Sequence, residues 1–305
     1  MNPTITLRRS LLYVPGDRPE MLAPAGPRGQ AKAAQRGADG LILNLEDAVA
    51  PARKELARQT VARALATADF GVAEVIVRVN PLATDTGYLD LLSIMPNAPA
   101  AVLLPKVTTV EEVRFAAWTV ERLEGLHGLP AGRTKIMCMI ESAAGILAAP
   151  EIAACHPRVA ALLFGAADFS AETGCTRTPD GRALLYATSR LVLAARSAGI
   201  DVIDAPHMKL DDAKGLARGA QMARELGFDG KSAIHPAQIA AINAAFSPSQ
   251  EQIAWARRVI ETLTGQPGAD LGAAVLDGQL IEAPHLTRAR RILALADAAK
   301  LGAET

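Results

Sequence analysis

The feature that most constrains the fold is an apolar run that leads to a carboxylate, because it occurs twice in succession. Residues 135–141 (KIMCMIE) are apolar from Ile136 up to Glu141, and residues 159–165 (VAALLFG) lead to Asp168. Buried strands of a parallel sheet lose the alternation of apolar and polar residues because both faces are covered. Parallel strands deliver their carboxyl ends to the same edge of a sheet. We therefore expect Glu141 and Asp168 to lie close together.

A buried carboxylate is costly unless it has a partner. Either acid alone could equally be a helix cap or an ion-pair partner. Two in succession fit a shared cation such as Mg²⁺ better, because Mg²⁺ prefers oxygen ligands and keeps several of its waters. The sequence therefore predicts a Mg²⁺ site formed by Glu141 and Asp168.

Composition limits the kind of protein this can be. The chain has 305 residues, of which 50% are apolar, and its formal net charge is zero. This composition allows a large core and gives no indication of binding to nucleic acid or to an anionic membrane. Three separated cysteines fit neither a disulfide framework nor a zinc site. The sequence shows no signal peptide and no apolar run of membrane-spanning length, so we expect a soluble cytoplasmic protein.

Predicted strands and helices alternate along the first 245 residues. The predicted strands are residues 10–15, 41–47, 74–80, 100–106, 135–141, 159–165, 200–206 and 230–234. Eight such units predict a (β/α)₈ TIM barrel, and we expect residues 1–245 to form this catalytic domain. An open doubly wound sheet is the alternative, but no glycine-rich dinucleotide loop follows the first strand. A barrel would gather the polar strand ends around one pocket, including those at Glu46, Arg78, Lys106, Asp204 and His235.

The pattern changes after residue 245. We expect a helix at 250–264, a linker at 265–268, a hairpin at 273–281 around Asp277-Gly278, and a final helix at 284–301. An Asp-Gly pair is typical of a two-residue hairpin turn. Residues 246–305 are therefore predicted to form a C-terminal extension with a helix–hairpin–helix arrangement, acting as a lid, an oligomerisation arm or both.

Short blocks in a fixed order give the chain a family resemblance. They are residues 9–16 (RSLLYVPG), 43–49 (LNLEDAV), 77–80 (VRVN), 104–107 (LPKV), 140–143 (IESA), 165–168 (GAAD), 227–236 (GFDGKSAIHP) and 277–285 (DGQLIEAPH). With these blocks the chain resembles the citrate-lyase β-subunit-like branch of the HpcH/HpaI aldolase family. That branch includes malyl-CoA, citramalyl-CoA and citryl-CoA lyases.

The resemblance implies roles for several residues. Glu141 and Asp168 match the Mg²⁺ ligands, and Arg78 matches the arginine that holds the carboxylate of a small 2-oxo acid. The main-chain N–H groups of Ala166 and Ala167, next to Asp168, would lie beside that acid. Arginine suits this role because its planar guanidinium can bind a carboxylate through two hydrogen bonds.

Further roles implied by the resemblance concern the acids after the second strand and the coenzyme. Glu46 and Asp47 would orient Arg78 and metal-bound water, and Arg18 and Lys32 would contact the phosphates of coenzyme A. Glu282 matches an acid that reaches a neighbouring subunit's active site and transfers a proton, in a homotrimer or hexamer.

The chain also departs from the family pattern. Glutamate replaces the usual aspartate at 282, Asn44 replaces an aspartate, and residues 23–29 resemble an insertion near the expected coenzyme entrance.

The predicted function is a Mg²⁺-dependent carbon–carbon lyase. It would cleave a 3-hydroxyacyl-CoA thioester to a 2-oxo acid and a short acyl-CoA, or run the reverse condensation. Three alternatives stay open: a thioesterase of malyl-CoA type, a citrate lyase β subunit acting on an acyl-carrier protein, and a non-catalytic metabolite sensor. A Schiff-base aldolase is a weaker reading, since it needs a desolvated lysine such as Lys106 as its nucleophile.

Overall fold

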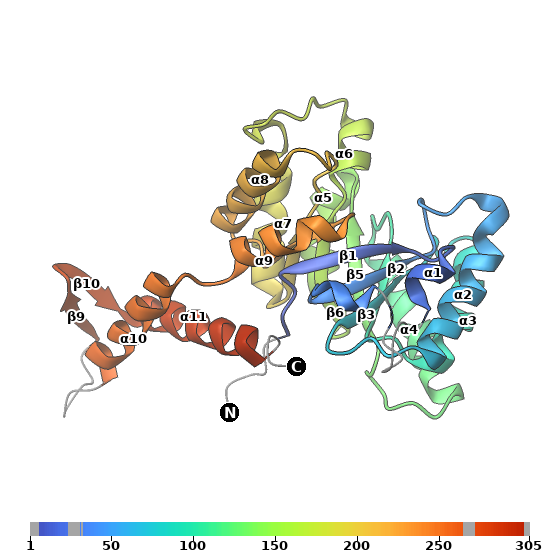
Figure 1. Cartoon of the computed structure of the whole chain (residues 1–305), viewed down its shortest axis with the longest axis horizontal. Helices are drawn as coiled ribbons and strands as arrows, with labels where there is room; N and C mark the ends of the chain where they lie inside the picture. The colour runs from blue at the N-terminus through green and yellow to red at the C-terminus, as the bar shows by residue number, and fades with distance from the viewer. Residues whose placement is uncertain (1–5, 24–30, 32, 265–271, 302–305) are drawn as a thin grey trace. The chain divides into compact units, whose positions relative to one another are not determined.

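A computed structural model describes residues 6–23, 31, 33–264 and 272–301 of the chain. Within these residues, eight parallel strands close into a barrel in sequence order, with β8 pairing back to β1 (Figure 1). The strands are β1 Ser10–Pro15, β2 Gly40–Asn44, β3 Glu74–Arg78, β4 Ala101–Leu104, β5 Lys135–Ile140, β6 Val159–Phe164, β7 Asp201–Asp204 and β8 Gly230–Ala233. The predicted TIM barrel is confirmed, and an open doubly wound sheet is excluded by the β1–β8 pairing.

Helices follow the strands around the barrel. The α-helices of this part are α1 Pro19–Leu22, α2 Lys54–Thr67, α3 Asp85–Ile94, α4 Val110–Leu126, α5 Ala143–Ala154, α6 Ala166–Thr173, α7 Leu185–Ala198, α8 Ala213–Leu226 and α9 Ile239–Phe246. Short 3₁₀ turns are η1 Ala34–Arg36, η2 Pro51–Arg53, η3 Met95–Asn97, η4 Arg182–Leu184 and η5 Pro236–Gln238. Among the described residues, no helix is long and apolar enough to cross a membrane.

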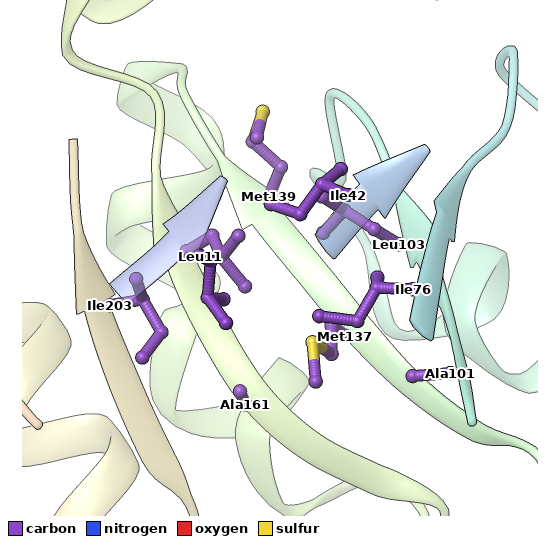
Figure 2. Close-up of a cluster of buried hydrophobic side chains, with 10 residues drawn as sticks. Leu11, Ile42, Ile76, Ala101, Leu103, Met137, Met139, Ala161 and Ile203 are labelled. Carbon is purple, nitrogen blue, oxygen red and sulfur yellow. The ribbon is translucent and has the colours of Figure 1, made fainter. Parts of the chain in front are cut away.

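The barrel interior is filled by one layer of apolar side chains after another. Figure 2 shows Leu11, Ile42, Ile76, Met137 and other members of this cluster pointing toward the barrel axis. Successive side chains of a strand point to opposite faces. Residues two positions beyond an inward side chain therefore also face inward, at the carboxyl end of the barrel. This rule directs Tyr13, Arg78 and Glu141 to the interior.

The first strand ends at Pro15, as predicted, and each of the other seven ends one to three residues before its predicted carboxyl end. β2 ends at Asn44, so Glu46 and Asp47 lie in the loop that follows it. β3 likewise ends at Arg78 and β5 at Ile140. Glu46, Asp47 and Glu141 lie beyond the strand ladders, because the strands of a barrel separate there into βα loops, where active sites are found.

Helix α5 shows how the outer layer tolerates a helix breaker. Pro150 lies inside α5 and has no N–H group to donate to the carbonyl of Ile146. Arg190 of α7 supplies the missing donor: its Nε lies 2.7 Å from Ile146 O, and its Nη2 donates to Leu147 O. The Arg190 guanidinium therefore links α7 to α5 at the turn where the proline leaves a carbonyl without its helical donor.

The chain divides into two compact units, one of which comprises Arg8–Ala245. The other continues from Phe246 and contains α10 Gln250–Thr264, β9 Ala273–Leu276, β10 Gln279–Glu282 and α11 Ala283–Leu301. Asp277 and Gly278 both have positive φ, as expected for the predicted Asp-Gly hairpin turn. A core of Ala256, Val259, Leu263, Ile281 and Ala289 holds these elements together. The role of this unit as lid or oligomerisation arm stays a prediction.

Candidate metal and carboxylate site

Arg78 lies at the centre of the candidate site. Its side chain extends from the end of β3 and is only 7% exposed. Its Nη2 atom lies 2.7 Å from Oε2 of Glu46, 3.6 Å from Asp47 and 3.9 Å from Glu141. The buried Nε atom has no hydrogen-bond partner among the described residues. Since an unsatisfied buried donor is costly, this N–H group favours a ligand that brings an acceptor.

Glu141 is a buried carboxylate just beyond β5, only 3% exposed. Its Oε1 atom accepts a hydrogen bond of 2.8 Å from the main-chain N–H of Lys106. Burial raises the pKa of Glu141 to about 7; Arg78 and the Lys106 N–H oppose this rise, while Asp168 and Glu46 add to it. The protein alone therefore provides too little positive charge to keep this carboxylate fully ionised at neutral pH.

The structure makes room for the Glu141 carboxylate through Gly165, which follows β6. A Cβ atom at residue 165 would lie 2.4 Å from Oε2 of Glu141, well inside van der Waals contact. Glycine is thus needed here for space, and the Gly165-Ala166-Ala167-Asp168 block of the sequence has a local physical reason.

Asp168 lies in the first turn of α6, and its side chain is exposed. Its charge adds to the rise in the pKa of Glu141, so the two acids interact electrostatically. Ala166 and Ala167 begin the same helix, and the first N–H groups of a helix have no acceptor within it. This edge of the barrel therefore combines two carboxylates with main-chain donors.

This pair fits a hydrated divalent cation. Among the described residues there is no group of three or more His, Cys, Asp or Glu side chains that could hold a metal ion. Two carboxylates with space for waters and for substrate oxygens suit Mg²⁺ rather than zinc, which takes three or four protein ligands. The raised pKa of Glu141 agrees with a carboxylate placed to receive positive charge.

Glu46 and Asp47 lie beside Arg78, as predicted. Glu46 is buried, and its Oε2 atom also accepts a 2.6 Å hydrogen bond from the Asp47 N–H. The Asp47 side chain is 55% exposed. Burial opposes its ionisation, but Glu46, Arg78 and Lys106 together lower its pKa, so Asp47 stays a carboxylate and is a weak base.

The remaining predicted site residues lie elsewhere or outside the described structure. Arg18 precedes α1 with an exposed side chain, its Nη1 atom 3.9 Å from Glu20. Lys32 lies outside the described residues, as do residues 24–29 of the suspected insertion. Glu282 ends β10 in the second unit; its side chain is exposed, and its N–H donates to Nδ1 of His285 at 3.1 Å. These roles stay predictions.

Two of the other polar strand ends have structural roles. Asp204 at the end of β7 forms an ion pair with Lys231 of β8. His235 caps η5 by accepting a hydrogen bond from the Ala237 N–H.

Tyr13 is a further member of the cluster, and its part in the site is not evident from the sequence. This inward-facing residue of β1 packs on the interior cluster. Burial raises the pKa of its hydroxyl; Arg78 lowers it, Glu141 and Glu46 raise it, and a hydrogen bond with Ser232 lowers it, so the phenol belongs to the same cluster. Its place two residues after Leu11 is the signal that could have identified it.

Lys106 also contacts the cluster. Its Nζ atom lies 3.1 Å from Oε1 of Glu46 and 3.5 Å from Oδ1 of Asp47. Burial lowers its pKa, but the two acids raise it more, so its pKa lies above the usual value. A protonated lysine is a poor nucleophile, which argues against the Schiff-base aldolase.

The described residues form a closed (β/α)₈ barrel with a buried arginine and carboxylates at the carboxyl ends of its strands, which is where barrel enzymes carry their active sites. Residues 9–236 match the family model for HpcH/HpaI aldolase/citrate lyase, so the chain belongs to that family. This confirms the predicted family and, with it, the class of carbon–carbon lyases.

Similar proteins span nearly the whole chain. The β subunit of citrate lyase from Leuconostoc mesenteroides subsp. cremoris is 36% identical over 96% of this chain and 94% of its own length. A (3S)-malyl-CoA thioesterase from Cereibacter sphaeroides is 37% identical over 95% of both chains. The structure of CitE from Mycobacterium tuberculosis in complex with magnesium, acetoacetate and coenzyme A is 31% identical, with a TM-score of 0.74 over 95% of this chain and 98% of that one.

Proposed function

We propose that the protein is a Mg²⁺-dependent lyase that cleaves a 3-hydroxyacyl-CoA thioester, of malyl-, citramalyl- or citryl-CoA type, to a 2-oxo acid and a short acyl-CoA, or joins them in reverse. The observation that carries the proposal is the buried Arg78 guanidinium. Its Nε atom has no partner among the described residues, and its Nη2 atom lies 3.9 Å from the Glu141 carboxylate. An anion-binding donor beside a cation-binding acid suits a 2-oxo acid, which presents a carboxylate and a neighbouring carbonyl.

The chain's own residues would bind and orient the substrate. Glu141 and Asp168 would hold Mg²⁺, which as a Lewis acid polarises the C–O group of the reacting carbon. Arg78 would hold the carboxylate, with Glu46 fixing the guanidinium at 2.7 Å. The first N–H groups of α6, at Ala166 and Ala167, are candidate donors to the carboxylate.

Cleavage also requires a proton transfer. The hydroxyl proton must leave as the carbon–carbon bond breaks, and the electron pair of that bond passes to the carbon beside the thioester, which is then protonated. Asp47 is a weak base because its pKa is lowered. We assign the transfer to Glu282, reaching the site of a neighbouring subunit in a homotrimer or hexamer. Loss of turnover in Glu282→Ala, with oligomeric mass and Mg²⁺ binding retained, would support this assignment; unchanged turnover would contradict it.

The test is turnover of the purified protein on a panel of 3-hydroxyacyl-CoA thioesters, with Mg²⁺ and with excess chelator. Metal-dependent release of a 2-oxo acid would support the lyase. Arg78→Lys should then lower kcat/KM by about 100-fold, because an ammonium group cannot reproduce a guanidinium's paired hydrogen bonds. A loss below threefold would contradict the role of Arg78.

Two further functions are favoured by the similar proteins. Likeness to a malyl-CoA thioesterase supports hydrolysis, which would release a free hydroxy acid and coenzyme A. Likeness to citrate lyase β subunits supports a carrier-bound substrate. Turnover only with an acyl-carrier protein would favour the latter, whereas a metabolite sensor would bind Mg²⁺ and a 2-oxo acid without turnover.

A further inference from the structure

Lys106 has a backbone conformation that lysine rarely adopts. It follows β4 after Pro105 and has a φ of +53°. A left-handed conformation costs free energy for a residue with a Cβ atom, and residues that keep it are concentrated at functional sites. Because glycine would remove this strain, the lysine side chain is expected to have a use here.

In this conformation, the main-chain N–H group and the side-chain ammonium group of Lys106 contact different acids. Its main-chain N–H donates to Oε1 of Glu141 at 2.8 Å. Its Nζ atom lies 3.1 Å from Oε1 of Glu46 and 3.5 Å from Oδ1 of Asp47. The side chain is 46% exposed, so the ammonium group lies at the open side of the cluster.

The acids that Lys106 contacts are also those that compete for Arg78. Nη2 of Arg78 lies 2.7 Å from Oε2 of Glu46 and 3.6 Å from Oδ2 of Asp47. Lys106 interacts with the other oxygen of each acid. Glu46 is thus shared between two cations, and Asp47 stays beyond hydrogen-bond distance of the guanidinium.

We propose that Lys106 is a positioning residue that holds Asp47 off Arg78 and offsets the charge of the acidic pair, so that the guanidinium stays available to the substrate carboxylate. The role rests on the proposed function, because it concerns the same 2-oxo acid. Lys106 acts through Arg78 and makes no contact with the reacting atoms. Its main-chain N–H orients Glu141 whatever the side chain, so the two contributions can be separated by mutation.

The experiment is calorimetric titration of Mg²⁺, followed by pyruvate in the presence of Mg²⁺, for the wild type and Lys106→Met. Methionine keeps an unbranched side chain, one atom shorter than that of lysine, and removes the charge. We expect pyruvate to bind about tenfold more weakly, or about 1.4 kcal/mol, with Mg²⁺ affinity changed less than threefold. Equal loss of both affinities, or unchanged pyruvate affinity, would overturn the proposal.

Two matched variants sharpen this test. Lys106→Arg keeps the positive charge and should restore pyruvate affinity to within threefold of the wild type. Lys106→Gly removes both charge and strain, so it should bind pyruvate as weakly as Lys106→Met but melt about 3 °C higher than that variant. Strong pyruvate binding by the glycine variant would show that the ammonium group has no such role.

A crystal structure of Lys106→Met tests the inference independently of the enzyme's activity. We expect the Asp47 carboxylate to move from 3.6 Å to hydrogen-bond distance of Arg78. If Asp47 stays in place, Lys106 does not hold it and the inference is wrong. If the wild type binds no pyruvate with Mg²⁺, the proposed function fails, and the position of Asp47 then decides the inference alone.

Discussion

The two ends of the barrel bury charged side chains in different ways. At the amino ends of the strands, two groups of charged side chains are matched: Arg8 binds Glu74 and Asp201, and the buried Arg158 binds Glu124 with contacts of 2.7 and 2.9 Å. At the carboxyl ends, four carboxylates surround two cations, and a buried guanidinium N–H group has no partner among the described residues. The ion pairs at the amino ends satisfy one another and stabilise the fold. The carboxyl ends have an excess of carboxylates and an unpaired N–H group, which suits the binding of a cation and an anion.

The largest effect on turnover is expected when the Glu141 carboxylate, which is proposed to bind Mg²⁺, is removed. Glu141→Gln should lower turnover by about 1,000-fold, because the Lewis acid contributes several kcal/mol. Burial raises the pKa of Glu141 to about 7 in the folded protein, so without metal its ionisation destabilises the fold as pH rises from about 4.5 to 7. The variant should therefore unfold at higher urea concentration than the metal-free wild type at pH 8. Glu111→Gln, the same change at an exposed position of α4, should alter neither property.

At the other end of the barrel the expected effect is on stability. Arg158→Met leaves Glu124 charged and buried, which should cost about 3 kcal/mol of unfolding free energy in urea titrations. The folded fraction should keep its turnover. Adding Glu124→Gln removes the unpaired charge and should recover part of the loss. A fall in kcat of the folded enzyme would contradict the division of roles between the two ends.

The next largest effect on activity is expected when the space beside the Glu141 carboxylate is filled. Gly165→Ala places a methyl group 2.4 Å from the Glu141 carboxylate and should lower kcat/KM by about 100-fold, since small displacements of reacting groups have effects of that size. The matched control is Gly125→Ala in α4, where a Cβ atom would meet nothing within 4 Å. That control should keep full activity and gain slightly in stability. Full activity of Gly165→Ala would show that the Glu141 carboxylate can move without loss of activity.

The smallest effect is on metal affinity. Because the pKa of Glu141 is raised to about 7, the acid is mostly protonated at pH 6 and mostly ionised at pH 8. The dissociation constant for Mg²⁺ should be about tenfold larger at pH 6 than at pH 8, with protons released on binding. Calorimetry in two buffers of different ionisation enthalpy measures both quantities. A pH-independent dissociation constant would mean that Glu141 is already ionised in the free protein.

The sequence was a reliable guide to the barrel and to the edge at which its polar strand ends gather. Apolar runs such as Ile136–Ile140 identify strands that are buried on both faces, and the acids that follow them identify the functional edge. The start of α4 also has a local cause, since Thr109 and Glu112 form a capping box there. Strand ends were less predictable, since Glu46 and Asp47 read as strand but lie in the loop beyond Asn44.

By itself, the sequence determined which residues could reach one another, because strand periodicity and the parallel order of the strands are local properties. It did not determine how the charges at the carboxyl end are paired. Only the tertiary structure decided that Glu46, and not Asp47, lies within hydrogen-bond distance of Arg78, that the Lys106 N–H binds Glu141, and that Tyr13 joins the cluster. The physical reason is that charge pairing depends on distances of a few ångströms between residues far apart in the chain, which closure of the barrel alone brings together.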